Sequence, residues 1–240
     1  MENEVTIFII NLKDDIEKKE HMLDLCSNIG LKVNVIEATD GRLLSDSFIE
    51  TVYSKTKSIE NIGRELSRSE IGCALSHKKI YSQIIDENIE QALILEDDVE
   101  FDESLINVLT KIPTIEKAWD IILLGHHTEA SREIDTRSSC WGRINIANSL
   151  QLARPCERAY GTYGYLISST GAKKMLSKLD LIQKPIDHYT GDNELSNLYI
   201  INPPPIKIHD ELSDNFNSME ERAKLDQKQV TLLISKKDSL

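Results

Sequence analysis

The chain has 240 residues, a net charge of −12, 40% hydrophobic residues and 5% aromatic residues. This length and composition fit one large α/β domain with an aromatic-poor core. The acidic balance argues against nucleic acid as a partner, because phosphate backbones attract basic surfaces, and against broad adsorption to anionic membranes. The four cysteines, Cys26, Cys73, Cys140 and Cys156, form no CxxC pair, so we predict neither a zinc site nor a disulfide framework.

The first 41 residues predict a strand, a helix and a second strand. Residues 5–10 read as a buried strand, 14–30 as a helix with Gly30 at its C-terminal cap, and 31–37 as a strand that ends in the turn 38–41. The acidic N-terminus lacks the basic start of a signal peptide, and the apolar run is too short to cross a bilayer. We therefore predict a cytoplasmic location.

Residues 42–67 are polar and weakly periodic, so we expect a mobile or substrate-facing insertion there. Ser67 and Glu70 have the spacing of a capping box and predict the start of a strong helix. Gly72 inside that helix predicts a close approach of backbone or ligand, with packing against another helix as the alternative. Ser76 and His77 are expected on the same side as Gly72.

Residues 91–95 predict a buried strand that runs directly into three acids, Glu96, Asp97 and Asp98. In α/β sheets ligands bind where the strands end. The three carboxylates repel one another, and the sequence has no Lys or Arg between Lys79 and Lys111. Mg²⁺ or Mn²⁺ prefers oxygen ligands and bridges to phosphate, which favours an enzyme that handles a nucleotide diphosphate. The alternative is an acidic, solvated loop.

The second half of the chain is predicted in shorter pieces. We expect a helix at 105–111, a strand at 119–124, a loop-rich region with room for a hairpin at 126–160, a strand at 163–168, a helix at 170–179, partial helix at 185–199 and an extended segment at 203–205. Nucleotide-binding GxGxxG, Walker A, HExxH and GxSxG motifs are absent from the sequence, which disfavours oxidoreductases, P-loop kinases, zincins and α/β-hydrolases.

Several segments, in this order, resemble glycosyltransferase family 25, the bacterial lipooligosaccharide glycosyltransferases related to collagen galactosyltransferases. The matching stretches are Ile9–Lys13, Glu37–Gly41, Glu70–His77, Ala92–Val99, Gly161–Ser168 and Pro185–Asp187. The resemblance extends from residue 5 to about residue 190. Where the family often has an Arg cluster, this chain has Lys13, Lys18 and Lys19, which cannot make the bidentate phosphate contacts of arginine.

The resemblance implies a GT-A type nucleotide-sugar transferase fold, with a mixed, mostly parallel sheet flanked by helices. It divides the chain into a transferase domain at 1–212, with a donor half at about 1–125 and an acceptor half at about 126–212, and a charged tail at 213–240. The implied reaction is inverting transfer of a hexose, most often galactose, from a UDP-sugar to a lipooligosaccharide or another surface glycan. Alternatives are a UDP-glucose or UDP-N-acetylhexosamine donor, nucleotidyl or phosphoryl transfer, and a non-catalytic metal- or glycan-binding module.

By the same resemblance, Mn²⁺ or Mg²⁺ is held by Asp98 and His209. The residues expected to line the donor site are Asn11, Asp40, Ser76, His77, Glu96 and Asp97. The candidates for the base that deprotonates the acceptor hydroxyl are Asp187 first, Asp192 second and Asp97 third. A lipid-linked acceptor would require peripheral association with the inner membrane. The tail lysines around residues 230–234 can contribute to such binding, and a solvated tail is the alternative.

Overall fold

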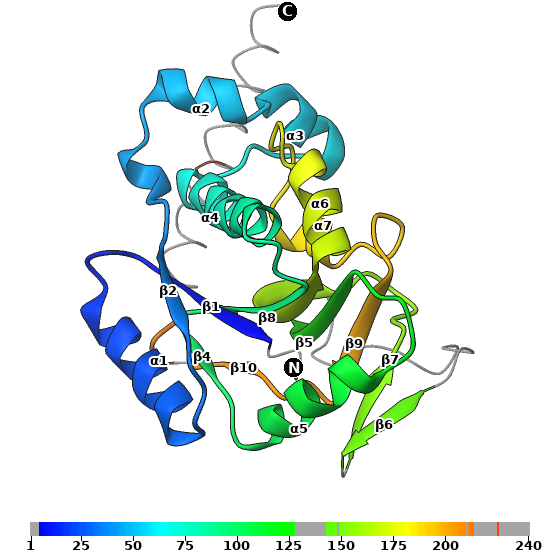
Figure 1. Cartoon of the computed structure of the whole chain (residues 1–240). Helices are drawn as coiled ribbons and strands as arrows, with labels where there is room; N and C mark the ends of the chain where they lie inside the picture. The colour runs from blue at the N-terminus through cyan, green and yellow to red at the C-terminus, as the bar shows by residue number, and fades with distance from the viewer. Residues whose placement is uncertain (1–4, 128–142, 148, 210, 214–224, 226–240) are drawn as a thin grey trace, which may run out of the picture.

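The computed structural model describes residues 5–127, 143–147, 149–209, 211–213 and 225. Its centre is an eight-stranded sheet (Figure 1). The strand order is β2 (Asn34–Glu37), β1 (Thr6–Asn11), β3 (Gln91–Glu96), β8 (Tyr160–Ser168), β5 (Ile121–His127), β9 (Leu198–Asn202), β7 (Leu150–Ala153) and β6 (Ile144–Ala147). Only β8 and β7 run against the others, so the sheet is mixed and mostly parallel in strand direction. The predicted α/β class, with a mixed, mostly parallel sheet flanked by helices, is confirmed.

The N-terminal strand–helix–strand unit is also confirmed. Helix α1 (Ile16–Asn28) connects β1 to the parallel strand β2. Its first turn is capped by the Asp15 side chain, and the chain leaves it through Gly30, whose φ of +74° favours glycine.

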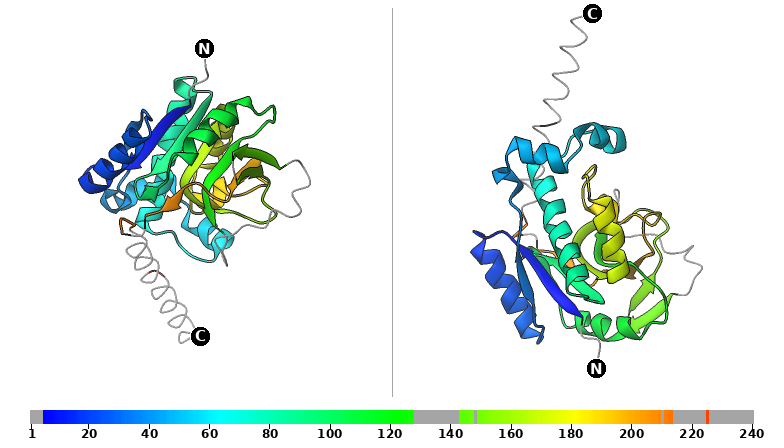
Figure 2. Two further views of the ribbon diagram at one scale, coloured as in Figure 1. Left: turned by 90° about the horizontal axis from the view of Figure 1, so that it is seen from below. Right: turned by 45° about the horizontal axis from the view of Figure 1, so that its top comes forward.

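Helices cover both faces of the sheet (Figures 1 and 2). Alternate residues of a strand point to opposite faces, so Phe8 and Ile94 pack beneath α4 (Arg68–Asp86) and α6 (Ser169–Lys178). Ile9 and Leu95 instead pack against α1 and α5 (Ser104–Lys111), followed by the short η2 (Ile112–Thr114). The predicted capping box opens α4, because Ser67 and Glu70 exchange side chain–backbone hydrogen bonds.

The segment 42–67, predicted as a mobile or substrate-facing insertion without a clear period, is largely helical. It follows η1 (Gly41–Leu43) and contains α2 (Asp46–Val52) and α3 (Lys55–Ile62). Ser45 and Ser54 cap the two helices with their side chains. Helices of only 7 and 8 residues are too short to develop a readable apolar stripe.

The second half of the chain contains the expected hairpin, formed by β6 and β7. Residues 185–199 are helical only in α7 (Asp187–Thr190) and then enter β9. A second, two-stranded sheet pairs β4 (Val99–Glu100) with β10 (Lys207–Ile208). The main sheet is continuous across residue 125, so the two predicted halves share it. The tail, apart from residues 213 and 225, lies outside the described residues, and so does Cys140. None of the helices within the described ranges combines the length and apolar character that crossing a bilayer requires.

Candidate active site

The three acids Glu96, Asp97 and Asp98 lie where β3 leaves the sheet. Neighbouring strands carry polar residues to the same point, because β1 ends at Asn11 beside β3 and β8 passes Thr162 on the other side. Each of the three carboxylates has different surroundings, and these differences determine what each can bind.

Glu96 is held from inside the protein. Its Oε1 accepts a hydrogen bond from the Thr162 hydroxyl at 2.9 Å and lies 3.9 Å from Cys73 Sγ and 3.6 Å from His77 Nε2. Burial acts to raise the pKa of Glu96, but the contacts with His77 and Thr162 outweigh it and keep that pKa below its usual value. Glu96 is therefore a fixed, ionised acceptor.

Asp97 is engaged by the N-terminal unit. Asn11 Nδ2 donates to its Oδ2 at 2.7 Å, and Lys18 Nζ lies 3.8 Å from its Oδ1. Lys18 is itself 8% exposed and lies 3.7 Å from Asp15. Burial raises the pKa of Asp97 above its usual value, although Asn11 and Lys18 act in the opposite direction.

Of the three acids, Asp98 is the one whose surroundings most disfavour a negative charge. Burial first, and then the charges of Glu96 and Asp97, raise its pKa to about 7, against smaller opposing effects of Lys18 and the Ser213 side chain. The pairing of β4 with β10 brings His209 alongside, and the His209 amide donates to the Asp98 carbonyl at 2.7 Å. The His209 ring meets that of His21 edge to face at 4.9 Å, and its Nδ1 is buried with no hydrogen-bond partner among the described residues.

The side chains of Asp98 and His209 are of the types that bind a divalent cation. A carboxylate crowded by two others and a buried imidazole nitrogen without a partner are the donors that Mn²⁺ accepts, and the carboxylate also suits Mg²⁺. Cys73, His77 and Glu96 also bring three ligand atoms within 4.8 Å of one another. That group fits a hydrogen-bonded cluster better, because burial raises the pKa of the Cys73 thiol well above its usual value and Glu96 already accepts from Thr162.

Ser76 joins α4 to the turn that carries Asp40. Its hydroxyl accepts from the Thr39 amide and donates to the Gly72 carbonyl, both at 2.8 Å. A Cβ on Gly72 would lie 2.5 Å from Gly41 N and from Thr39 O, so the predicted close approach at Gly72 is one of backbone to backbone. Asp40 is partly exposed and pairs with Arg42, whose hydrogen bonds lower the Asp40 pKa.

The first two of the three base candidates, Asp187 and Asp192, have unlike surroundings. Asp187 is the first residue of α7, and its charge is among those that raise the Cys73 pKa, which places it toward the acidic cluster. Asp192 is 6% exposed, and its carboxylate pairs with Arg158 at 2.9 Å and Lys184 at 3.4 Å beside a cavity of about 310 Å³.

Sequence reasoning missed Lys18, Thr162 and Tyr165 as members of the site region. Tyr165 bonds the fully buried His77 at 2.8 Å, and Thr162 bonds Glu96. The two β8 residues lie within the matched stretch 161–168, which was the available signal. Lys18 was noted among the lysines that stand where the family often has an Arg cluster, but it was given no role, because its approach to Asp97 depends on how α1 packs.

The chain was also compared with known proteins. The family model of glycosyltransferase family 25 (LPS biosynthesis protein) matches residues 4–190. Procollagen galactosyltransferase 2 of Homo sapiens is 30% identical over 182 residues, or 71% of this chain and 27% of that protein. The probable inactive glycosyltransferase 25 family member 3 of Bos taurus is 26% identical over 195 residues, or 76% of this chain and 30% of that protein. The crystal structure of A197 from STIV aligns with a TM-score of 0.39 and 11% identity, over 82% of this chain and 81% of that one. The chain spans less than a third of the length of the curated relatives it matches. Because the family model matches well over half of its residues, the chain belongs to glycosyltransferase family 25.

Proposed function

We propose that this protein transfers a hexose, most simply galactose, from a UDP-sugar to a lipooligosaccharide or another glycan acceptor, with inversion at the anomeric carbon. Family membership supports glycosyl transfer, and the relatives named procollagen galactosyltransferases support galactose. UDP-glucose and UDP-N-acetylhexosamine are the alternative donors.

The observation that carries the proposal is that three adjacent acids have different surroundings. Glu96 is held by Thr162, and Asp97 is held by Asn11 and Lys18. Asp98 is the acid whose surroundings most disfavour its charge, and it lies beside His209. A solvated acidic turn would not need three distinct sets of buried contacts.

Asp98 and His209 would hold Mn²⁺ or Mg²⁺, and such an ion would stabilise the charge that grows on UDP as it leaves. Glu96 and Asp97, each already oriented by protein donors, would contact the ribose or share the metal. Lys18 brings to this edge of the sheet the positive charge that the stretch between Lys79 and Lys111 lacks.

Asp187 is our choice for the base that takes the acceptor hydroxyl's proton as it attacks the sugar from the face opposite UDP. Asp192 is less suited, because pairing with Arg158 and Lys184 makes its carboxylate a weak proton acceptor. Asp97 is less suited too, since Asn11 and Lys18 occupy its two oxygens. Inversion needs a single displacement, so no covalent nucleophile is required.

UDP release from UDP-galactose, UDP-glucose and UDP-N-acetylglucosamine, with a mixed oligosaccharide acceptor pool, tests the proposal. We expect release from one donor with Mn²⁺ or Mg²⁺ and none with a chelator. Asp98→Asn should lower turnover by about a hundredfold or more. Glu103→Gln is the matched control, because it removes an exposed acid five residues away. Metal or glycan binding without turnover of any donor would favour a non-catalytic binding module instead.

A further inference from the structure

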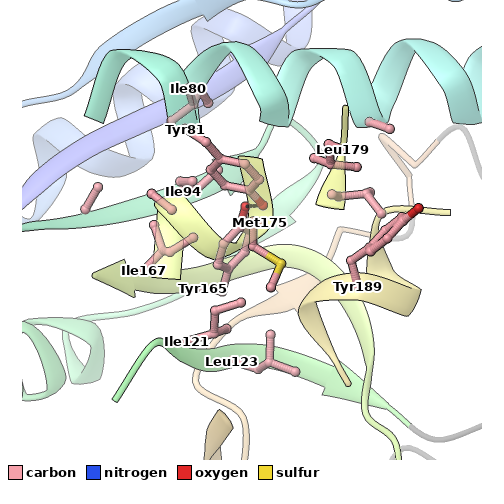
Figure 3. Packing of buried hydrophobic residues seen from close by; sticks show 14 of the residues in the cluster. Ile80, Tyr81, Ile94, Ile121, Leu123, Tyr165, Ile167, Met175, Leu179 and Tyr189 are labelled. Carbon is pink, nitrogen blue, oxygen red and sulfur yellow. Dashed lines mark hydrogen bonds between the residues drawn. The ribbon is translucent and has the colours of Figure 1, made fainter. Parts of the chain in front are cut away.

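Helix α4 presents Cys73, His77 and Tyr81 along the side that faces β3 and β8. A spacing of four residues is slightly more than one helical turn, so the three side chains follow one face. His77 and Tyr81 are fully buried, in a layer packed mainly with apolar side chains. Figure 3 shows Tyr81 of α4 meeting Tyr165 of β8 in this layer.

These side chains form a continuous chain of polar contacts that ends at Glu96. The Tyr81 and Tyr165 hydroxyl oxygens are 2.6 Å apart, and the Tyr165 hydroxyl lies 2.8 Å from His77 Nδ1. The His77 and Tyr165 rings stack at 5.8 Å with an interplanar angle of 26°. His77 Nε2 faces Glu96 Oε1 at 3.6 Å.

These contacts determine which ring nitrogen of His77 carries the hydrogen that points toward Glu96. A neutral imidazole protonated on Nε2, or an imidazolium, presents an N–H to the carboxylate. The other neutral tautomer would set a nitrogen lone pair against the carboxylate charge. With Nε2 protonated, Tyr81 can donate to Tyr165 and Tyr165 can donate to His77 Nδ1, while the Nε2–H faces Glu96 Oε1 at 3.6 Å, a charge contact just beyond hydrogen-bond distance.

We propose that Tyr81, Tyr165 and His77 form a positioning chain that fixes the Glu96 carboxylate for binding the nucleotide diphosphate donor. His77 then acts through Glu96 and does not itself touch the donor. The proposal rests on the proposed function, because it specifies how the donor site is held in shape.

The contacts on Glu96 support this role. Those from Thr162, Cys73 and His77 all reach Oε1, while 28% of the side chain is exposed. Oε2 is therefore the oxygen that can meet a ligand, and its direction depends on how firmly Oε1 is anchored. Apolar side chains of similar volume would fill the same layer without the cost of burying three polar groups.

Two substitutions at His77 separate positioning from simple packing. A glutamine amide can place its nitrogen near the Nε2 position and keep a donor toward Glu96, whereas an asparagine amide reaches only the Nδ1 position and keeps a partner for Tyr165. Both remove the ring, so both should lower the melting temperature similarly.

The readouts are the dissociation constant of UDP in the presence of Mn²⁺, by calorimetry, and the KM for the UDP-sugar set against kcat. We expect His77→Asn to raise the UDP dissociation constant about tenfold, because no N–H then faces the Glu96 carboxylate, and His77→Gln to raise it less than threefold. Tyr165→Phe should also raise it, and Tyr81→Phe should raise it less, because it leaves the Tyr165–His77 bond in place.

Equal UDP affinity of the two His77 variants, or losses of affinity that only follow the melting temperature, would overturn the positioning chain while leaving the proposed function intact. Failure of the unmodified protein to bind UDP would overturn the proposed function, and the positioning chain with it.

Discussion

His126 gives a pH dependence of stability whose size can be worked out. It lies in β5 with 1% of its surface exposed, and its Nε2–H donates to the Ile201 carbonyl at 2.8 Å. Its Nδ1 is buried without a hydrogen-bond partner among the described residues. Burial, with a smaller contribution from His127 and against the Ile201 bond, lowers its pKa from 6.5 to about 4.

The folded protein therefore resists protonation that the unfolded chain accepts. As the pH falls below 6.5, the unfolded chain binds a proton at His126 before the folded protein does, so the free energy of unfolding falls until about pH 4. Between pH 7 and pH 4.5 these two pKa values correspond to a loss of about 2–3 kcal/mol. Above pH 6.5 this contribution to stability is complete.

Urea unfolding of the unmodified protein and of His126→Gln at pH 7 and pH 4.5 measures this contribution. The glutamine amide can keep the bond to Ile201 but cannot titrate. Acidic residues titrate alike in both proteins, so they cancel in the comparison, and the unmodified protein should lose about 2–3 kcal/mol more than the variant. The neighbouring His127→Gln should keep most of the pH dependence, because His127 makes only a smaller contribution to the lowered pKa of His126. Equal losses in the unmodified protein and His126→Gln would refute the reasoning and mean that the folded protein protonates His126 readily.

Three further predictions concern the site and its support. Gly72→Ala places a methyl group against Gly41 N and Thr39 O, so we expect the free energy of unfolding to fall by about 1–3 kcal/mol. Ser82→Ala in the same helix is a near-neutral control. An unchanged denaturation midpoint for Gly72→Ala would contradict the close contact. Lys18→Met should destabilise the protein by about 1–3 kcal/mol, because it removes a cation beside Asp15 and Asp97. Adding Asp97→Asn should recover part of this loss. Strict additivity of the two changes in a double-mutant cycle would show that Lys18 and Asp97 do not interact. Asp187→Asn should lower kcat by about 10²–10⁴ with little change in UDP affinity. Asp192→Asn should instead lower the melting temperature, since Arg158 and Lys184 lose their counter-charge, and the reverse pattern would exchange the roles of the two acids.

Local signals explain what could be predicted of the fold. Each of three local signals correctly predicted the element next to it. The apolar run at 91–95 predicted β3, the Ser67–Glu70 capping box predicted the start of α4, and Gly30 predicted the end of α1. Strand β9 was hidden, because a short apolar run fits a strand or a buried helix equally well. Strands β4 and β10 have two residues each and exist only through their pairing.

The site could be predicted only where its functional residues are adjacent in the sequence. Three adjacent acids reveal a cluster, but their separate partners come from distant parts of the chain. Lys18 reaches Asp97 through the packing of α1, and Thr162 reaches Glu96 through the insertion of β8 beside β3. The approach of His209 to Asp98 followed from the family resemblance alone, since the β4–β10 pairing left no pattern in the sequence.

The central place of β8 has a consequence for how the chain folds. It joins β3 on one side and β5 on the other, although it follows both in the sequence. During synthesis, β1, β2 and β3 can pair early, but one edge of β3 stays open until residues 160–168 have emerged. Such long-range closure slows folding and leaves an apolar strand edge exposed to other chains. Because Thr162 is on that same strand, its hydrogen bond to Glu96 can form only when the sheet closes. A chain that stalls before this step would be prone to aggregation and would also lack the complete candidate site.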